Sequence, residues 1–253
     1  MNVLVCVKRV PETGARITLT PDAQAIETSL LGFTISPHEE CAVEEALRIA
    51  QDHGGSTTVL TLGPPGATEQ LQNAMAMGID TAVLLETDGG DWNAEATATA
   101  IAEAIRVRPE EFDLLLFGNE AADSGDYQVG LRVAHLLGLP CVTGIKGIVI
   151  DDGRLTARRE AGGGWEIFEL PLPAVATVKE GINLPRYASL PGRLRAKKTP
   201  IERTKPRPRA SALETIRLVV PPEQETHVEI LGGGVDAAPR VVGVLRDLGL
   251  LRS

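Results

Sequence analysis

The residues best suited to bind a ligand lie in one polar loop, Gly118–Val129, with the sequence GNEAADSGDYQV. The loop follows an apolar run and precedes a helical pattern, so it is expected to leave a strand and enter a helix. Asn119, Asp123, Ser124 and Gln128 can hydrogen-bond a ribose, a base edge or a phosphate, and free amides at a helix start can hold an anion. An ordinary capped loop would have the same features, so the residues alone leave both interpretations open.

Patterns typical of hydrolytic or metal chemistry do not occur in the sequence. None of the four histidines, His38, His53, His135 and His227, has metal-ligand spacing to a cysteine or to another histidine. There is no G-x-S-x-G motif, and neither a Walker lysine nor a G-x-G-x-x-G motif follows the first apolar run. We therefore predict that the chain is neither a self-contained hydrolase nor a metalloenzyme, and that backbone and amide groups would hold any nucleotide.

The first half of the chain alternates short apolar runs with helical patterns. Strands are predicted at Val3–Val7, Thr57–Leu62, Thr81–Leu85 and Asp113–Phe117. Four helices are predicted between and after these strands. The first begins with a capping box at Ser36–Glu39, and the second follows Gly63–Gly66 and ends at Met77. The third spans Ala94–Val107 and the fourth about Tyr127–Leu137. Such alternation indicates βαβ units and a parallel sheet covered on both faces, which makes the fold class α/β.

The second half has a different pattern. Val142–Val178 is rich in strand formers with two glycine-containing turns, so β-hairpins are predicted there. Pro185–Pro222 is rich in proline and arginine with little periodicity, which indicates an extended arm, and Ala237–Leu251 has a helical pattern. We therefore predict an α/β nucleotide-binding domain over residues 1–184, and a recognition loop with an extended C-terminal arm and a terminal helix over residues 185–253.

Charge is distributed unevenly along the chain. Arg186–Arg209 carries nine Lys or Arg and one acid, which gives +8, so the remainder of the chain, with a total of −9, carries −17. A nucleic-acid binder would spread basic charge over a face, so we predict no nucleic-acid partner. The basic segment fits an arm that docks on acidic protein surface, and it equally fits a solvated tail. The pairs Glu39–Glu40 and Glu44–Glu45 are predicted on a solvated helix face.

Cellular context is suggested by three features. No apolar run is long enough for a membrane span or a signal peptide, so membrane insertion is not expected. Cys6, Cys41 and Cys141 are odd in number and lie in apolar surroundings, which is typical of reduced thiols. No Arg- and Ser-rich presequence is evident. These features favour a cytoplasmic protein.

The stretch Leu170–Lys198 is the most informative in the chain. Its middle, N-x-P-R-Y-A-S-L-P, has no Cys, His or acidic residue, and Pro185 and Pro191 should stiffen it as an extended loop. Arg and Tyr are enriched at protein interfaces, and an apolar Leu accompanies them. The segment is therefore predicted to be a surface for a protein partner.

Several stretches together resemble the beta subunit of electron transfer flavoprotein over nearly the whole chain. They are Val3–Val10, Glu40–Ala46, Ala74–Gly78, Gly118–Gly130 and Leu170–Lys198. The last is the most specific, since L-P-x-P-x-V-x-T followed by N-x-P-R-Y-x-x-L-P is the family's signature region. The resemblance implies an adenine-nucleotide-hydrolase-like (Rossmann-like) three-layer α/β domain with β-hairpin additions and an extended C-terminal arm.

The resemblance also implies a heterodimer with an alpha subunit that carries most of a redox FAD site, while this chain holds a structural AMP. Electrons would pass from primary dehydrogenases through that FAD to a quinone reductase. The nucleotide-binding positions that align are Cys6, Ser36, Pro37, His38, Glu39, Leu62, Gly118, Asn119, Glu120, Ala121, Ala122, Asp123, Ser124, Gly125, Asp126, Tyr127, Gln128 and Val129.

Two further sets of residues align with functional positions of the family. The partner-recognition set is Arg186, Tyr187, Leu190, Pro191, Arg195, Lys197 and Lys198, with Leu190 as the apolar anchor that enters a dehydrogenase pocket. Thr13 and His38 align with positions that face the flavin of the alpha subunit, where members that bind AMP have aromatic residues.

Three departures from the AMP-binding pattern leave the nucleotide open. Cys6 stands where Ala is frequent, Ser36 where Asn is frequent, and Val129 replaces a Thr whose hydroxyl can hold a terminal phosphate. Electron-bifurcating members look similar here and bind a second FAD in place of AMP, so both AMP and FAD fit the resemblance. A more remote alternative is a nucleotide-binding protein of the universal-stress type, which would be a homodimer without flavin.

Overall fold

A computed structural model describes residues 1–12, 14, 16–89, 92–207, 215–222 and 228–251 of the chain. By their contacts the residues form two compact units, Met1–Ile216 and Arg217–Ser253. The described residues 185–207 and 215–216 fall in the first unit.

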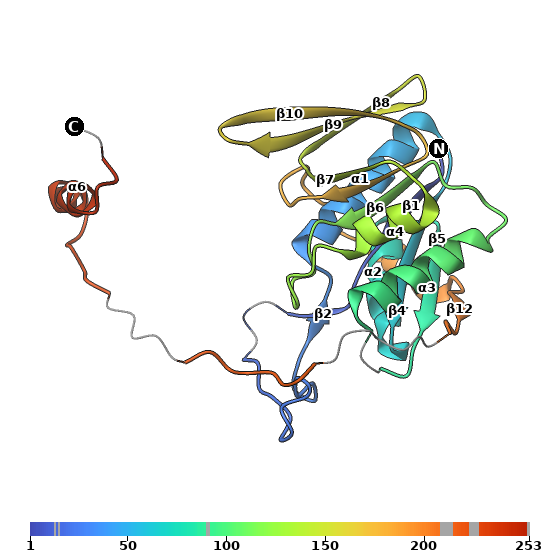
Figure 1. Cartoon of the computed structure of the whole chain (residues 1–253), viewed down its shortest axis with the longest axis horizontal. Coiled ribbons are helices and arrows are strands. Elements are labelled where there is room, and N and C mark those ends of the chain that lie inside the picture. The colour runs from blue at the N-terminus through green and yellow to red at the C-terminus, as the bar shows by residue number, and fades with distance from the viewer. Residues whose placement is uncertain (13, 15, 90–91, 208–214, 223–227, 252–253) are drawn as a thin grey trace. The chain divides into compact units, whose positions relative to one another are not determined.

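The first unit is built on a seven-stranded parallel sheet, called here the main sheet (Figure 1). Its strand order is β12–β5–β4–β1–β6–β11–β7, and neighbouring strands run parallel throughout. The strands are β1 (Val3–Cys6), β4 (Thr57–Gly63), β5 (Thr81–Glu86), β6 (Leu114–Gly118), β7 (Cys141–Ile145), β11 (Ala174–Val178) and β12 (Glu202–Thr204).

Helices cover both faces of the main sheet, and each face has its own apolar cluster. One cluster joins β1 residues such as Val3 to α1 (Pro37–His53) and α2 (Thr68–Met77). The other joins β1 residues such as Leu4 to α3 (Ala94–Arg106) and α4 (Val129–Leu137). Successive strand residues point to opposite faces, so the continuous apolar runs of the strands supply both cores. The three-layer α/β fold expected from the sequence is confirmed.

Local signals in the sequence account for several helix boundaries. Ser36 caps α1 by accepting a hydrogen bond from the amide of Glu39, and Glu39 completes the capping box. Asn93 caps α3 by accepting a hydrogen bond from the amide of Ala96. A short 3-10 helix, η1 (Pro65–Ala67), precedes α2.

A three-stranded antiparallel sheet packs beside the main sheet. It contains β8 (Gly147–Asp151), β9 (Arg154–Ala161) and β10 (Gly164–Pro171), with the two predicted turns between its strands. Figure 1 shows β9 and β10 extending as a ribbon beyond the main sheet. A second small sheet pairs β2 (Val10–Pro11) with β3 (Phe33–Thr34).

Two expectations for the second half of the chain were wrong in part. Hairpins were predicted throughout Val142–Val178, but β7 and β11 pair with each other in parallel and extend the main sheet. An extended chain was predicted from Pro185 to Pro222, but Leu190–Lys198 forms helix α5. Ser189 caps this helix, and a proline in the first turn costs no hydrogen bond because amides there have no intrahelical partner.

The second unit contains a 3-10 helix, η2 (Val235–Ala237), and helix α6 (Ala238–Asp247), which lies within the stretch predicted to be helical. None of the residues of α6 is buried. Within the described part of the chain, no helix combines the length and apolar character needed to cross a membrane.

Candidate functional site

The candidate site lies where the chain reverses its direction of travel across the main sheet. From β1 the chain adds β4 and β5 on one side, then returns to place β6 on the other side of β1. In open parallel sheets, ligands bind beyond the carboxyl ends of the strands at such a switch point. Cys6 ends β1 and Gly118 ends β6, so both lie at this edge.

Glu39 joins the end of β1 to the start of α1. Its Oε2 atom accepts a hydrogen bond from the amide of Ser36 at 3.0 Å, and its Oε1 atom accepts one from the amide of Lys8 at 2.9 Å. Ser36 and Glu39 are both buried, although the sequence placed Glu39 on a solvated face. That expectation was wrong because the carboxylate bonds backbone amides inside the site.

Burial shapes the titration of two groups here. It raises the pKa of Glu39 to about 8, although hydrogen bonds from the amides of Ser36 and Lys8 oppose the shift. Burial also raises the pKa of the Cys6 thiol, and the nearby Glu39 charge raises it further. Cys6 therefore stays a neutral thiol and does not supply a nucleophile.

Gly118 allows β6 to approach α1 closely. A Cβ atom at this position would lie 2.7 Å from the Cγ atom of Glu39 and 3.4 Å from the Cβ atom of His38. Any side chain would push the helix start away from the strand end. The absence of a side chain at Gly118 is therefore what permits the contact between β6 and the start of α1.

Two polar pairs hold the loop 118–129 against the opposite side of the site. The Nε2 atom of His38 lies 3.1 Å from the Oε1 atom of Glu120, and the amide of Glu180 donates to the Nδ1 atom of His38 at 2.8 Å. Since Nδ1 accepts, Nε2 carries the proton and donates to Glu120. Lys8 forms an ion pair with Asp123 at 2.8 Å.

Helix α4 begins at the end of this loop without a side-chain cap at Gln128. A Cβ atom at Gly130 would lie 2.9 Å from the Cγ2 atom of Thr177 and 3.2 Å from the Cγ atom of Phe117. The first turn of α4 therefore packs on the carboxyl ends of β6 and β11. Val129 packs against the apolar cluster on this face. Uncapped amides at such a position suit an anion.

Asn119 is hydrogen-bonded to Thr177, a residue that was not predicted to belong to the site. Its Oδ1 atom accepts a hydrogen bond from the Thr177 hydroxyl at 2.9 Å, and that hydroxyl accepts one from the amide of Gly144, also at 2.9 Å. The amide of Asn119 donates to the carbonyl of Val178 at 2.8 Å. Thr177 is the final Thr of the L-P-x-P-x-V-x-T motif, so the motif contained the signal.

The remaining predicted nucleotide residues lie on the same edge, on β4, α1 and the loop. Leu62 is the penultimate residue of β4, and Pro37 is the first residue of α1. The amide of Gly125 donates to the carbonyl of Ala121 at 2.8 Å, and Asp126 accepts from the amide of Gln128 at 3.0 Å. The exposed loop residues are Ala122, Asp123, Ser124, Gly125, Tyr127 and Gln128. Thr13 lies outside the described residues.

The predicted partner-recognition residues fall into two groups. Tyr187 is 99% exposed and Leu190 is 72% exposed, and Pro191, Lys197 and Lys198 are also exposed. Arg186 and Arg195 instead use their guanidinium groups within the chain. Arg186 bonds Glu44, and the Nη2 atom of Arg195 donates to the carbonyl of Met75 at 3.2 Å.

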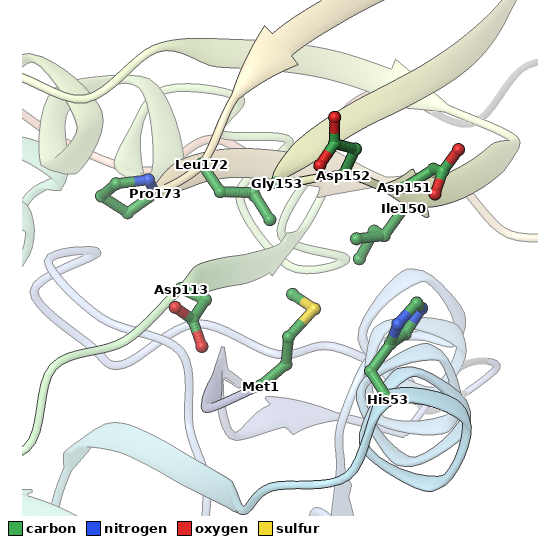
Figure 2. A pocket seen from close by; sticks show the side chains of 9 residues that line it. All are labelled: Met1, His53, Asp113, Ile150, Asp151, Asp152, Gly153, Leu172 and Pro173. Carbon is green, nitrogen blue, oxygen red and sulfur yellow. The ribbon is translucent and has the colours of Figure 1, made fainter.

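A cavity of about 490 Å³ lies at the opposite edge of the main sheet (Figure 2). Asp113 precedes β6 and Pro173 precedes β11, so the cavity lies at the amino ends of these strands. Its carboxylates, on Asp113, Asp151 and Asp152, would repel a phosphate. The cavity does not suit a nucleotide. Its lining residues are Met1, His53, Asp113, Ile150, Asp151, Asp152, Gly153, Leu172 and Pro173.

The parallel main sheet with helices on both faces places the chain in the Rossmann-like α/β class. The family described as "Electron transfer flavoprotein domain" matches residues 25–208. The electron transfer flavoprotein subunit beta of Bacillus subtilis is 34% identical over 256 residues, which cover 98% of each chain. The mitochondrial subunit beta of Oryza sativa subsp. japonica is 34% identical, covering 90% of this chain and 92% of its own.

A third relative is the caffeyl-CoA reductase-Etf complex subunit CarD of Acetobacterium woodii. It is 34% identical over 79% of this chain and 77% of its own. The chain belongs to the electron transfer flavoprotein beta-subunit family. The resemblance seen in the sequence is thereby confirmed.

Proposed function

We propose that this chain is the beta subunit of a heterodimeric electron transfer flavoprotein. With an alpha subunit it would complete a site for FAD, which accepts electrons from primary dehydrogenases and passes them to a quinone reductase. When bound, the flavin supplies the redox chemistry, while the protein supplies binding, orientation and electrostatics. The observation that carries the proposal is the match to beta subunits over 98% of the chain.

We further propose that the edge formed by Cys6, Ser36–Glu39 and the loop 118–129 holds AMP. The uncapped start of α4 would bind the phosphate through its amides. Side chains such as Ser124 and Gln128 are exposed on the loop and could bond a ribose or a base edge. Among the described residues, no group of three or more His, Cys, Asp or Glu side chains is placed to hold a metal ion. The nucleotide would be held by hydrogen bonds.

A second FAD is the alternative occupant, and one observation favours it. Val129 packs its side chain against the apolar cluster and presents no hydroxyl at the start of α4. A hydroxyl at this position can hydrogen-bond the terminal phosphate of AMP. The pyrophosphate of FAD has no terminal phosphate there, because the FAD molecule continues beyond it. In that case the heterodimer would be an electron-bifurcating protein.

The test is to purify the heterodimer, denature it and quantify the released nucleotides by chromatography. One FAD and one AMP per heterodimer would support the electron-relay function, and two FAD would support the bifurcating alternative. Val129→Thr is the matched variant, and it is expected to shift the content toward AMP. A preparation with neither nucleotide, and no association with an alpha subunit, would overturn the proposal.

The exposed residues of 187–198, called here the recognition segment, are proposed to contact the dehydrogenase. Leu190 protrudes from the first turn of α5 and would insert into an apolar pocket, while Lys197 and Lys198 would face acidic surface. Leu190→Ala is expected to weaken electron transfer from the dehydrogenase and leave FAD content unchanged. An unchanged dependence of rate on dehydrogenase concentration would contradict the assignment.

Helix α6 is proposed to pack on the alpha subunit. It has an amphipathic pattern but no buried residue, and Val241 and Val244 are 42% and 39% exposed. Val244→Glu is expected to lower the affinity for the alpha subunit, whereas Arg246→Gln in the same helix, which changes the net charge by the same amount, serves as the charge-matched control. Equal affinities for the two variants would count against a role of the apolar stripe.

A further inference from the structure

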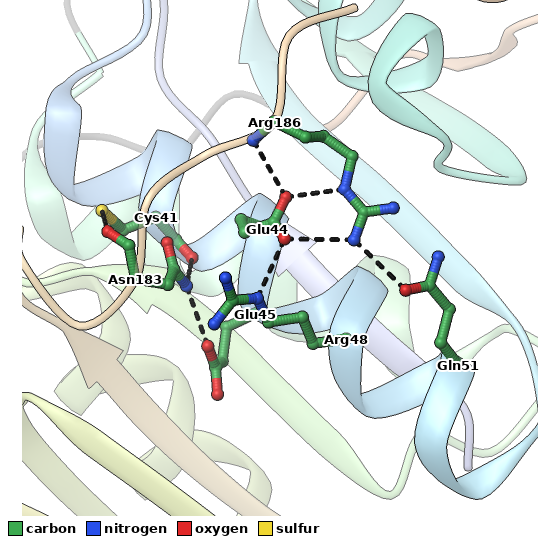
Figure 3. Close-up of polar contacts among 7 residues, drawn as sticks. All are labelled: Cys41, Glu44, Glu45, Arg48, Gln51, Asn183 and Arg186. Atoms are coloured by element: carbon green, nitrogen blue, oxygen red, sulfur yellow. Dashed lines mark hydrogen bonds and ion pairs between the residues drawn. The ribbon is translucent and has the colours of Figure 1, made fainter.

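The chain that leads to the recognition segment is held on helix α1 by a polar cluster (Figure 3). Both carboxylate oxygens of Glu44 take part. The Oε2 atom accepts from the amide and Nε of Arg186 at 3.1 and 2.8 Å, and the Oε1 atom accepts from Nη2 of Arg186 at 3.0 Å. Arg48, one turn further along α1, donates its Nε to the same Oε1 at 2.9 Å.

Glu44 is a buried carboxylate whose side chain is only 4% exposed. Burial by itself would raise its pKa, but the hydrogen bonds from Arg186 and Arg48 outweigh burial and hold the pKa below its usual value. A buried charge without a partner is strongly unfavourable, so Glu44 needs a guanidinium at this position. Arg186 is separated from it by 142 residues in sequence, which means that the cluster fixes a long-range contact.

A second anchor lies three residues before Arg186. The Nδ2 atom of Asn183 donates to the carbonyl of Cys41 at 2.9 Å and to the Oε2 atom of Glu45 at 2.8 Å. Arg186 also donates to Gln51 at 3.2 Å, so its guanidinium spans two turns of α1. With Pro185 restricting the backbone between the two anchors, residues 183–186 have little freedom to move.

Exposure differs sharply between the anchoring residues and their neighbours, since Leu184, between the two anchors, is 84% exposed. Arg186 is turned toward α1, whereas the next residue, Tyr187, is 99% exposed and Leu190 is 72% exposed. The Nε and Nη2 donors of Arg186 are engaged by Glu44 and Gln51, so only its Nη1 donors remain for a partner protein. The placement of Arg186 therefore fits a residue that orients its neighbours.

We propose that Glu44 and Arg186 are positioning residues for partner recognition. They hold residues 183–186 on α1 so that Tyr187 and Leu190 are presented in one orientation before the dehydrogenase arrives. The inference rests on the proposed function of the recognition segment, and it assigns Arg186 to internal anchoring. Loss of either partner is expected to release the segment, which lowers the fraction of molecules that are competent to bind.

The test uses the purified heterodimer with bound FAD and the variants Glu44→Gln, Arg186→Gln and the double variant. Each single variant is expected to raise the KM for the heterodimer as substrate of the dehydrogenase about tenfold, as it would if about one tenth of the molecules stayed competent. The kcat value and the FAD content should not change. Because the two residues act as a unit, the double variant should be no worse than the worse single variant.

Two controls separate positioning from general damage. Asp52→Asn changes an exposed carboxylate on the same helix and should leave KM unchanged. Hydrogen exchange should show faster exchange at residues 184–194 in Glu44→Gln and unchanged exchange in the main sheet. If Glu44→Gln does not fold, Arg186→Gln alone decides, because Arg186 is more exposed and its loss leaves the helix sequence intact.

The outcomes distinguish this inference from the proposed function. If Leu190→Ala raises KM but Glu44→Gln and Arg186→Gln do not, the positioning role is wrong and the recognition segment stands. If Leu190→Ala has no effect on KM, the recognition assignment fails and the positioning role falls with it. A fall in kcat or in FAD content without a change in KM would also overturn the inference, since it would indicate structural damage at the flavin.

Discussion

Gly192 in helix α5 should not tolerate a side chain, and Gly192→Ala tests the packing of the recognition segment. A Cβ atom built at Gly192 would lie 2.3 Å from the carbonyl oxygen of Ala76, at the end of α2. Ordinary contacts of this kind begin at 3.4 Å, so α5 or α2 must move by about 1.1 Å. The obstructing atom belongs to the backbone of a helix, which cannot rotate away as a flexible side chain would.

The magnitude follows from two opposing effects. Overpacking of this kind typically costs about 1–3 kcal/mol. Alanine is preferred over glycine in a helix by about 1 kcal/mol, which offsets part of the cost. Because the obstructing atom is helix backbone, the overpacking cost should lie in the upper part of that range, about 2–3 kcal/mol. The expected net destabilisation is therefore about 1–2 kcal/mol. For a domain of this size, each kcal/mol lowers Tm by roughly 2–4 °C, so the expected decrease is about 4 °C.

The assay is thermal and urea-induced unfolding of the full chain, with Gly243→Ala as the matched control. No heavy atom lies within 4 Å of a Cβ atom built at Gly243, in the middle of α6, so this change should cause no loss of stability. Hydrogen exchange on Gly192→Ala should be faster in α5. If Gly192→Ala is as stable as the parent protein, α5 does not pack on α2 as closely as the contact with Ala76 requires.

Three further predictions concern the candidate site and the core. Glu39→Gln should destabilise the chain by about 1–3 kcal/mol, because one amide donor loses its acceptor. Because the folded pKa of Glu39 is raised from 4.5 to about 8, its stabilising contribution is present below pH 4.5 and is lost as the pH rises through 8. The deficit of the variant in urea unfolding should therefore be larger at pH 5 than at pH 8, and equal deficits would contradict the raised pKa. Gly130→Ala should cost about 1–3 kcal/mol in urea unfolding through its contacts with Thr177 and Phe117, and a neutral effect would mean that α4 packs less closely. Thr61→Val should cost about 1 kcal/mol, because the buried Thr61 hydroxyl donates to the carbonyl of Val7 at 2.7 Å; unchanged urea unfolding would refute this.

The sequence predicted the first half of the fold well because its signals are local. The capping box at Ser36–Glu39 marks the start of α1, and the apolar runs of β1, β4, β5 and β6 stand between clear helical patterns. It predicted the second half less well because the pairing there is not local. The residues of β11 are as rich in strand formers as those of the hairpins, and only tertiary packing places β11 between β6 and β7.

The helix face with Glu44 and Glu45 shows the same limit at the level of single residues. Two adjacent acids on a helix are typical of a solvated face, yet both are buried. The groups that bury and bond them, Asn183 and Arg186, arrive about 140 residues later in the chain. In the candidate site, the residues on the edge could be identified from the resemblance, but the engagement of Asn119 by Thr177 depends on strand register.

Helix α1 connects the two regions for which we propose a function. Its first turn, through Glu39, is bonded to the amide of Lys8 at the candidate nucleotide site, and its middle, through Glu44, is bonded to Arg186 beside the recognition segment. Helix formation is cooperative, so a nucleotide that stabilised the first turn of α1 would also stabilise the part of α1 that supports the recognition segment. An AMP in this position would thus contribute to partner recognition without contacting the partner. Removal of the nucleotide should therefore increase hydrogen exchange in residues 184–194 as well as at the site, and an increase confined to the site would mean that α1 does not couple its two ends.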